Sequence, residues 1–327
     1  SLTQLRVDFG DEIANLVDGV TKLDKLTYGP TAEAETVRKM VIAMSRDIRV
    51  LVIKLADRLH NARTWSYVSS ESAQRKARET LDIYAPLAHR LGITAIKWEL
   101  EDLAFRYLEP EAYKAIAKAL AERRADREAY IARFVTELRS LLAAQHLHAE
   151  VQGRAKHIYS IHRKMQRKRL TLDQLYDLRA VRIVCESVAE CYAALGVVHG
   201  HWPYIRGEFD DYIATPKDNF YRSIHTAVIG PAGVPVEVQI RTLEMHQQAE
   251  LGVAAHWRYK EGGARDASFE KKIEWVRRLL DTPEATGAGD QDFLDRVRAE
   301  LFEDRVYALT PRGEVVDLPQ GATALDF

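Results

Sequence analysis

The spacing of hydrophobic residues changes from helical to strand-like near residue 146, and this change constrains the fold more than any other feature. Before it, apolar side chains recur every three or four positions, as Leu51, Leu55 and Leu59 do, which predicts helices. After it they alternate with polar residues, most clearly over 236–241, which predicts half-buried strands. We therefore expect an all-helical part followed by a mixed α/β part.

Two segments of the helical part carry specific expectations. Pro86 lies inside an apolar helical pattern, and because proline lacks an amide hydrogen we expect a kink or a new helix there. The stretch 111–144 is rich in Ala, Arg and Glu and is expected to be a solvated connector.

The α/β part is expected to contain an antiparallel hairpin. Residues 222–229 and 236–240 are joined by Gly230-Pro-Ala-Gly233, which has the residues of a turn. Alternation also predicts strands near 147–151 and 181–185. Residues 305–318 predict a second, short hairpin with too little core to fold alone, which we expect to begin a further domain.

Composition excludes several classes of protein. The 327 residues carry 47 basic and 48 acidic side chains, so no overall charge favours nucleic acid or an anionic membrane as a partner. No apolar run approaches the roughly 18 residues of a membrane span. Two cysteines are too few for a disulfide scaffold and suit a reducing cytoplasm. The sequence has no HExxH, no GxxxxGK(S/T) and no GxGxxG after a strand, which argues against zinc proteases, P-loop proteins and dinucleotide folds.

A run of basic residues over 151–170 is the first candidate site. It holds seven Lys and Arg residues and no acid. A solvated helix face and a phosphate site explain the run about equally well. Four polar side chains two to four residues apart could share one face of a turn that opens a helix, whose N-terminus also favours anions. These are Arg154, Lys156, Ser160 and Lys164.

One face of the 236–240 strand is the second candidate. Its polar side chains alternate with valine and isoleucine, and the ordinary interpretation is the wet side of an antiparallel sheet. The preceding strand would add an aromatic ring and an imidazole beside a carboxylate, which favours a functional surface. The residues that share this face are Glu237, Gln239, Arg241, Tyr221, Ser223 and His225.

Acidic residues offer two candidate metal sites. Asp177 is interpreted either as a structural residue paired with Arg182 or, with Glu237, as a carboxylate pair for Mg²⁺, which prefers oxygen ligands and substrate phosphates. In the helical part, Asp57 and Asn61 are four residues apart and thus neighbours on one helix face. Such a pair is ordinarily a surface feature, and a metal site there would need His or Asp partners from elsewhere. The chain contains no His-Asp dipeptide.

Five segments carry sequence motifs in a fixed order: 153–165, 176–183, 209–217, 221–225 and 236–242. They resemble the long RelA/SpoT homologues, which make and hydrolyse the alarmone (p)ppGpp, and the similarity covers essentially the whole chain. Because the chain begins with Ser1, we expect a piece of a longer protein.

The resemblance also implies how the chain is divided. It predicts an incomplete helical HD-type hydrolase-like domain with a connector over 1–143, and a mixed-sheet, nucleotidyltransferase-like synthetase domain over 144–262. A helical linker over 263–303 and the truncated start of a TGS domain over 304–327 would follow.

The implied reaction moves the β,γ-pyrophosphate of ATP onto the 3′-hydroxyl of GDP or GTP, a transfer that depends on positioning and charge neutralisation. The resemblance implies that Arg154 and Arg182 stack on the adenine by cation–π contact. It places Lys156, Ser160 and Lys164 on the ATP phosphates. It assigns Mg²⁺ to Asp177 and Glu237, with Glu237 also taking the proton of the attacking hydroxyl.

For the acceptor nucleotide, the resemblance implies that Tyr221 stacks on guanine. Around it would lie Lys217, Asn219, His225 and Gln239. The chain has Phe220 where the family often has a small residue before this tyrosine, so the shape of the loop is expected to differ. The acidic segment Glu208, Asp210 and Asp211 resembles the version found in RelA-like, synthesis-only members. Its charges are expected to favour GDP over GTP.

The helical part departs further from the family. Asp57 and Asn61 match a downstream metal ligand and a nucleotide contact of the hydrolase, whose His and His-Asp ligands would lie upstream of Ser1. We therefore expect no hydrolase site here, and Mn²⁺ only where that site is intact. The intact Asp57 and Asn61 favour a bifunctional parent, whereas the acidic motif favours a synthesis-only one and is given more weight.

Three hypotheses follow: a synthetase fragment with an inert hydrolase remnant, a fragment of a bifunctional enzyme, and a ribosome- or RNA-binding module. The third would place aromatic residues among the basic ones, and Tyr159 alone is present in that run. The resemblance implies a cytoplasmic protein with ATP and GDP or GTP as ligands. Through C-terminal domains that this chain lacks, it implies the ribosome and uncharged tRNA as partners.

Overall fold

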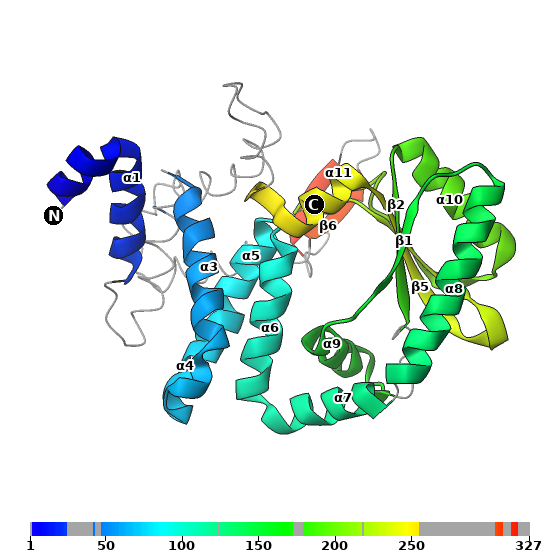
Figure 1. Cartoon of the computed structure of the whole chain (residues 1–327), viewed down its shortest axis with the longest axis horizontal. Coiled ribbons are helices and arrows are strands. Elements are labelled where there is room, and N and C mark those ends of the chain that lie inside the picture. The colour runs from blue at the N-terminus through cyan, green and yellow to red at the C-terminus, as the bar shows by residue number, and fades with distance from the viewer. Residues whose placement is uncertain are drawn as a thin grey trace. The chain divides into compact units, whose positions relative to one another are not determined.

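The structure is a computed structural model, and it describes residues 2–24, 42, 47–122, 124–172, 179–217, 219–254, 305–309 and 315–319. The chain divides into two compact units, one of residues Asp57–Lys272 and one of Ser1–Ala56 together with Ile273–Phe327. Figure 1 labels most of the helices and strands used below. No helix within the described ranges is long and apolar enough to cross a membrane.

The unit that holds both ends of the chain contains α1 (Leu2–Asp24), which is interrupted at Gly10 by a φ of 82°. It also contains the strands β6 (Arg305–Leu309) and β7 (Val315–Pro319), which pair antiparallel. The hairpin expected at 305–318 is therefore confirmed. The linker expected over 263–303 lies outside the described residues, and the assignment of 304–327 to a TGS domain stays a prediction.

Every regular element described before residue 145 is helical, as the sequence predicts. In chain order these are α3 (Arg49–Arg63), a 3-10 turn (Trp65–Tyr67), α4 (Ser70–Glu79), a π-helical turn (Thr80–Tyr84), α5 (Ala85–Arg90), α6 (Thr94–Leu108), α7 (Pro110–Glu122) and α8 (Arg124–Ala144).

Pro86 marks a new helix, as expected. It lies in the first turn of α5, directly after the π-helical turn. The amide of Ala85 donates to the carbonyl of Thr80, five residues back. A wider turn accommodates a residue that cannot donate to the carbonyl four residues before it.

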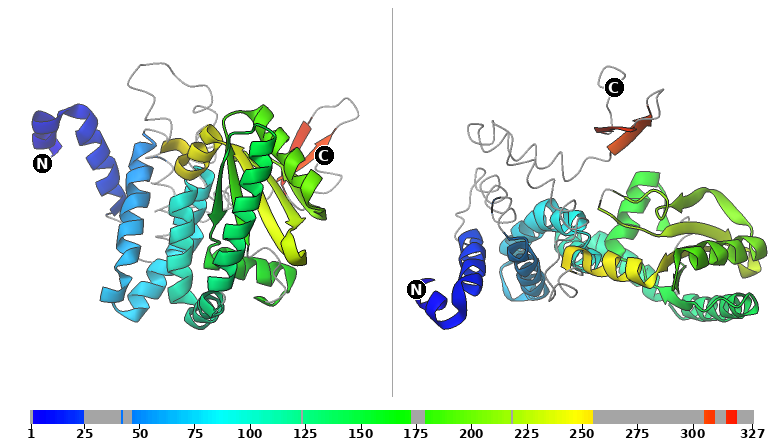
Figure 2. Two further views of the ribbon diagram at one scale, coloured as in Figure 1. Left: turned by 45° about the vertical axis from the view of Figure 1, so that its right-hand side comes forward. Right: turned by 90° about the horizontal axis from the view of Figure 1, so that it is seen from above.

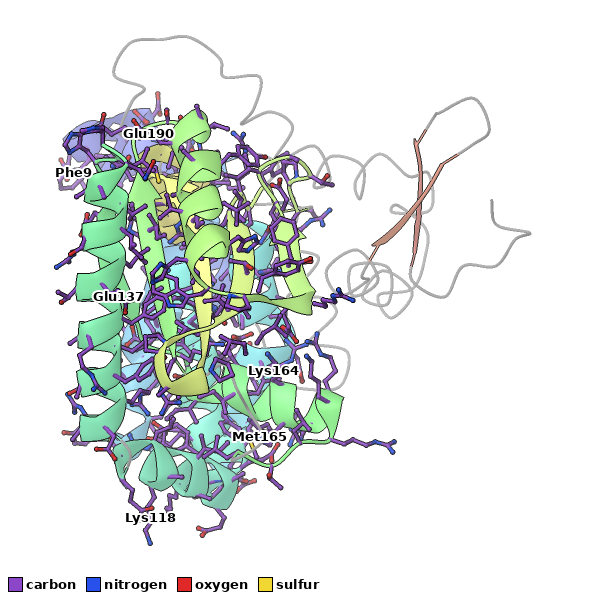
Figure 3. The ribbon with its side chains drawn as sticks, turned by 90° about the vertical axis from the view of Figure 1, so that its right-hand side faces the viewer. Phe9, Lys118, Glu137, Lys164, Met165 and Glu190 are labelled. Carbon is purple, nitrogen blue, oxygen red and sulfur yellow. The ribbon has the colours of Figure 1, made fainter. Side chains whose placement is uncertain are left out.

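The expectation that 111–144 is a solvated connector is wrong for α8. Four side chains spaced every four residues along this helix are buried against the sheet. They are Tyr130, Phe134, Leu138 and Leu142. Figure 3 shows α8, marked by Glu137, running alongside the strands. The Arg and Glu residues between these positions make the segment polar in average composition. The four-residue spacing of its apolar side chains nevertheless indicates one buried helix face.

A five-stranded mixed sheet follows, with strand order β1-β2-β5-β4-β3. Its strands are β1 (Glu150–Arg154), β2 (Ala180–Cys185), β3 (Tyr204–Asp211), β4 (Ile224–Ile229) and β5 (Pro235–Thr242). The pair β2–β5 is parallel and the other pairs are antiparallel. The hairpin expected from the Gly230–Gly233 loop is β4–β5, and its turn uses positive φ at Ala232 and Gly233.

The two faces of the sheet differ in chemistry. One face carries Val181, Ile183, Val238 and Ile240, which form a core with side chains of α8 and of α10 (Val188–His201). The views in Figure 2 show these helices beside the sheet. The other face is polar and meets α9 (Ile158–Lys168) and α11 (Leu243–Leu251). The candidate site lies on this polar face.

Candidate active site

The polar face carries a row of side chains fixed by strand register. Gln239 of β5 lies directly opposite Arg182 of β2 and His225 of β4. Two residues earlier, Glu237 is flanked by Ala180 and Ala227, whose small side chains leave room above the sheet. The grouping expected for this face is therefore observed.

The interpretation of this face as the wet side of a sheet is wrong. The side chain of Gln239 is 3% exposed and that of Arg241 is 1% exposed. Arg241 donates to Nδ1 of His246 at 2.6 Å and to Oε1 of Glu250 at 3.3 Å, both on α11. Burial lowers the pKa of Arg241 although Tyr221 and Glu250 act in the opposite sense. A buried cation without partners would be strongly destabilising. His246 and Glu250 of α11 supply the partners of Arg241.

The basic run and the strand face meet in one cavity of about 240 Å³. Its lining combines residues from both candidate sites: Arg154, Lys156, Ser160, Lys164, His225, Glu237 and Gln239, with His157 and Ile161. An exposed helix face would not converge on a carboxylate in this way. For these residues the structure favours an anion-binding cavity over a solvated surface.

Glu237 is held in its charged form by its neighbours. Its carboxylate forms an ion pair with Lys156, accepts a hydrogen bond from Nε2 of Gln239 at 2.9 Å, and lies 3.8 Å from Arg154. Burial alone would raise the pKa of Glu237, but Lys156 and then Arg154 outweigh it, so the pKa lies below its usual value. The carboxylate is therefore ionised at neutral pH.

The N-terminus of α9, which was expected to favour an anion, is capped by a carboxylate of the chain itself. The carboxylate of Asp102, on α6, accepts hydrogen bonds from the backbone amides of Ile158 at 3.3 Å and Tyr159 at 2.8 Å. The same carboxylate lies 3.6 Å from the His157 ring. Because an internal carboxylate already occupies the helix end, the positive charge of this cavity comes from side chains such as Lys156 and Lys164.

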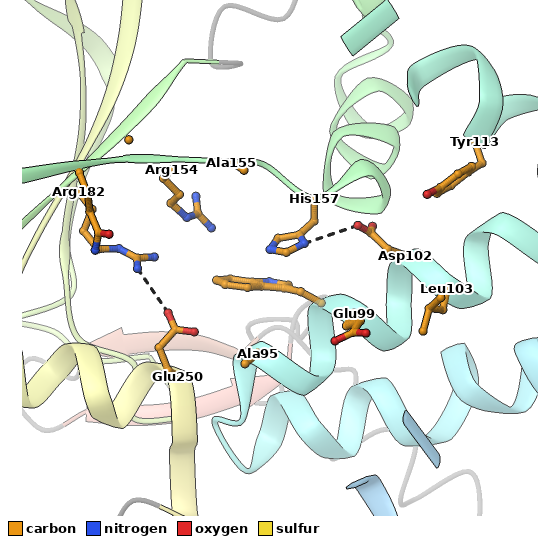
Figure 4. A pocket seen from close by; sticks show the side chains of 13 residues that line it. Ala95, Glu99, Asp102, Leu103, Tyr113, Arg154, Ala155, His157, Arg182 and Glu250 are labelled. Carbon is orange, nitrogen blue, oxygen red and sulfur yellow. Dashed lines mark hydrogen bonds and ion pairs between the residues drawn. The ribbon is translucent and has the colours of Figure 1, made fainter. Parts of the chain in front are cut away.

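A larger cavity of about 510 Å³ adjoins the first and shares Arg154 and His157 with it. It is lined by Arg154 and Arg182, which the family resemblance assigns to one nucleotide base. Figure 4 shows Arg182 directed at Glu250, with which it forms an ion pair at 3.5 Å. Burial, followed by the nearby Arg241 and Arg154, lowers the pKa of Arg182 to about 10.

An aromatic cluster surrounds Tyr221. Its hydroxyl lies 2.9 Å from Nε2 of His225. The ammonium of Lys217 is 4.2 Å from the ring centroid of Tyr212 and 5.8 Å from that of Tyr221. Burial lowers the pKa of His225 to about 3, so this imidazole is neutral at pH 7. The structure thus brings together three of the residues assigned to the acceptor nucleotide.

Asn219, which was also assigned to the acceptor nucleotide, and its neighbour Phe220 have distinct surroundings. The amide of Asn219 donates to the backbone carbonyl of His89 at 3.2 Å, which ties this loop to the end of α5. Phe220 has a φ of 62°, and its amide donates to the carbonyl of Lys217 at 2.7 Å. A bulky residue with positive φ is uncommon, which gives a physical reason for a small residue at this position.

The three residues of the acidic segment lie in different surroundings. Glu208 forms an ion pair with Lys168 at 2.8 Å. Asp211 accepts hydrogen bonds from the hydroxyl of Tyr192 and from two backbone amides of the following turn. Asp210 lies opposite His225 in the β3–β4 register and contributes, after burial, to raising the pKa of Tyr212 to about 12. Of the three, Asp210 is therefore the one beside the acceptor cluster, and its effect on selectivity stays a prediction.

The metal assignments are only partly described. Asp177 falls within 173–178, outside the described residues, so its pairing with Glu237 stays a prediction. Asp57 and Asn61 are neighbours, as expected, with a hydrogen bond of 3.0 Å. Within the described part of the chain, no three His, Cys, Asp or Glu residues are grouped so that they could hold a metal. An ionised carboxylate such as that of Glu237 is a ligand type that suits Mg²⁺.

Sequence reasoning missed four residues of this region. Trp98 and Asp102 come from α6, Tyr212 follows β3, and Glu250 lies on α11. Trp98 and Asp102 are four residues apart on a helix, which puts them on one face. No local pattern shows that this face meets a loop more than 50 residues later in the chain.

Fold and site together define an α+β protein with a helical first part and a cavity on a mixed sheet that is lined by lysine and arginine side chains and a carboxylate. Residues 153–264 match the family described as "Region found in RelA / SpoT proteins", and residues 1–94 match the HD domain. The chain therefore carries the region that RelA and SpoT proteins share, preceded by a match to the HD domain.

Among curated proteins, the chain is 50% identical over its whole length to a GTP pyrophosphokinase of Streptomyces coelicolor. It is 51% identical over 99% of its length to the GTP pyrophosphokinase of Escherichia coli K12. It spans 40% and 45% of the length of these relatives. Among solved structures, small alarmone synthetase 1 of Bacillus subtilis bound to pppGpp is 26% identical with a TM-score of 0.34, over 57% of this chain and 98% of that one.

Proposed function

We propose that this chain transfers pyrophosphate from ATP to the 3′-hydroxyl of GDP or GTP and so makes (p)ppGpp. The observation that carries the proposal is the single cavity in which Lys156, Ser160 and Lys164 face Glu237. The name GTP pyrophosphokinase, carried by relatives about 50% identical over the whole chain, supports the same activity.

The donor nucleotide is assigned to the two adjoining cavities. Arg154 and Arg182, in the larger one, would hold the adenine by stacking of their guanidinium planes. Lys156, Ser160 and Lys164, in the smaller one, would bind the triphosphate. Both cavities contain Arg154, so a single nucleotide can extend from one into the other.

Glu237 is assigned to Mg²⁺ binding together with Asp177. The ion would neutralise phosphate charge and orient the transferred group. The ion pair with Lys156 also affects the pKa of this carboxylate. When ATP phosphates draw Lys156 away, Glu237 loses the contact that contributes most to holding its pKa down. Mg²⁺ would take over this contact, and the ionised carboxylate would stay available to accept the proton from the attacking hydroxyl.

The acceptor nucleotide is assigned to the cluster around Tyr221. The guanine would stack on Tyr221, with Lys217, Asn219, His225 and Gln239 around the nucleotide. The neutral imidazole of His225, whose pKa is about 3, can accept or donate one hydrogen bond without adding charge. Gln239 bridges the two halves of the site because its amide also donates to Glu237.

The other hypotheses have less support from the described residues. An RNA-binding module would present its cations on an open surface, whereas Arg154 and Lys156 are less than one-fifth exposed and face Glu237. Asp57 and Asn61 are compatible with a bifunctional parent. Binding of the ribosome and tRNA by C-terminal domains, and a cytoplasmic location, complete the proposal.

The test is to incubate the purified chain with labelled ATP, GDP and Mg²⁺ and to separate the products. The proposal requires AMP and ppGpp in equal amounts. Omission of GDP and the variant Lys156→Ala should both abolish the product. Release of ADP and phosphate without ppGpp would show a different phosphoryl chemistry, and an absence of any nucleotide turnover would overturn the assignment.

A further inference from the structure

The indole of Trp98, on α6, lines the larger cavity together with residues of the sheet. It stacks on the imidazole of His157, with ring centroids 4.7 Å apart and planes inclined by 27°. The guanidinium of Arg154 lies 5.1 Å from the indole centroid. An aromatic ring from the helical part of the chain therefore lies beside an arginine assigned to the donor base.

The two adjoining cavities differ in chemistry. The larger holds Trp98, Tyr113 and Leu103 with two arginines, which suits a flat aromatic ring with a polar edge. The smaller is dominated by Lys156, Lys164 and Glu237, which suits a metal-bound polyphosphate. A nucleoside triphosphate matches this order, with its base beside Trp98.

Packing of the helix does not explain the position of Trp98. The side of α6 that enters the protein core carries Leu100, Ala104 and Phe105, each at most 1% exposed. Trp98 is half-buried, and its nearest aromatic partner, His157, lies in the loop that precedes α9. A large ring kept half-open at a cavity wall is available to a ligand.

We propose that Trp98 contacts the base of the donor nucleotide, so that the helical part supplies one wall of the donor site. This inference rests on the proposed function. The base binds against the indole of Trp98 on the side where Arg154 now lies over the ring. Asp102 acts as a positioning residue, because its carboxylate holds both His157 and the start of α9.

The test compares Trp98→Ala and Trp98→Phe with wild type in steady-state synthesis. Stacking of a base on an aromatic ring corresponds to a factor of about 5 to 150 in affinity. We expect Trp98→Ala to raise the KM for ATP about tenfold or more, while kcat changes less and the KM for GDP is unchanged. Trp98→Phe should restore most of the affinity, since it retains a π-face.

Trp202→Phe is the matched control. Trp202 is 5% exposed and stacks on Phe134 in the core, with ring centroids 4.5 Å apart. This substitution should lower the melting temperature and leave the KM for ATP unchanged. If Trp98→Ala behaves like the control, with lower stability and an unchanged KM for ATP, Trp98 is a packing residue and the inference fails.

Tryptophan fluorescence separates this inference from the proposed function. Titration with ATP and Mg²⁺ should quench wild-type emission, and the quench should be lost in Trp98→Phe and kept in Trp202→Phe. A saturable quench without ppGpp formation would contradict the proposed reaction but would still support the contact between Trp98 and the base. A quench that survives in Trp98→Phe would overturn the base contact, whatever the activity.

Discussion

Lys156 and Glu237 form an ion pair inside the smaller cavity. The lysine is assigned to phosphate and the carboxylate to Mg²⁺ and the attacking hydroxyl. Without nucleotide, each therefore serves as the other's counter-ion. The pair avoids leaving a buried carboxylate without compensation, and ATP with Mg²⁺ can replace both contacts at once.

We expect Glu237→Gln to reduce synthesis at least ~10²-fold, because an amide neither binds Mg²⁺ as a carboxylate does nor accepts a proton. Nucleotide binding should survive, since the other cations of the cavity remain. Rate and ATP affinity are measured separately, with Glu244→Gln on the exposed side of α11 as the control. Near-normal turnover in Glu237→Gln would remove the assignment.

Stability is expected to fall with acid, partly through His225. Burial lowers its folded pKa to about 3, whereas an unfolded histidine titrates near 6.5. Between these values the unfolded state binds the extra proton, so stability is full above about pH 6.5 and is lost as pH falls toward 3.

Replacement of His225 by Gln should reduce this pH dependence by about 1 kcal/mol per pH unit near pH 5. Urea unfolding of both proteins at pH 7, 6 and 5 measures the slope. Identical slopes for wild type and His225→Gln would contradict a buried, neutral imidazole at this position.

We expect no hydrolysis of ppGpp by this chain in the presence of Mn²⁺. Asp57 and Asn61 supply two polar groups on one helix face, and a metal site needs further ligands. Pyrophosphate release is measured with labelled ppGpp against a blank without protein. Metal-dependent release that disappears in Asp57→Ala would show that a hydrolase site is assembled after all.

GDP should be preferred over GTP by a few-fold. Asp210 lies opposite His225 in the acceptor cluster, and its charge would oppose the additional phosphate of GTP by about 1 kcal/mol, less at high salt. Glu208 and Asp211 have partners elsewhere. The prediction therefore depends on Asp210 more than on the segment as a whole.

Asp210→Lys should narrow or invert this preference. The measurement is kcat/KM for both acceptors at saturating Mg-ATP, at low and moderate salt. Glu122→Lys, the same charge change at the end of α7, is the control. An unchanged ratio in Asp210→Lys would place the selectivity elsewhere, and equal wild-type efficiencies would remove the electrostatic argument.

Gly252→Ala is expected to destabilise the fold by about 2 kcal/mol or more. Gly252 has a φ of 54°, and a Cβ there would overlap the carbonyl oxygen of Leu91 and lie 2.5 Å from the carbonyl carbon of Gly92. Gly196→Ala is the matched comparison. Its Cβ would meet nothing within 4 Å in the middle of α10, so a gain of about 0.5–1 kcal/mol is expected. Chemical denaturation of both variants measures the change in the free energy of unfolding. Equal changes would contradict the close contact at Gly252.

Local patterns predicted much of the fold. The change of period near residue 146 separates helices from strands, Pro86 begins a helix, and the Gly230–Gly233 turn joins β4 to β5. These features depend on neighbours in the sequence. The family motifs added the assignment of Lys156, Ser160 and Lys164 to a site with Glu237, and these four residues line one cavity.

What the sequence did not predict depends on long-range contacts. Polar and apolar residues alternate around Gln239, as in a strand with one solvent-exposed face. In the structure the polar face is buried, and α11 contacts it through Glu250. Charged residues lie between the apolar side chains of α8, and these side chains are buried by a sheet whose strands follow later in the sequence. The capping of α9 by Asp102 joins residues 56 and 57 positions apart. No short window of sequence contains both partners of these contacts.

The contact between Asp102 and the start of α9 bears on how such a chain can be shortened. A fragment that begins at β1 would keep every strand of the sheet but lose α6 as well as α8, and the backbone amides of Ile158 and Tyr159 would be left without their acceptor. The first turn of α9 would then be less stable. A free-standing version of the sheet would therefore need its own acid before this helix. The point at which helices give way to strands is thus a poor place to cut the gene.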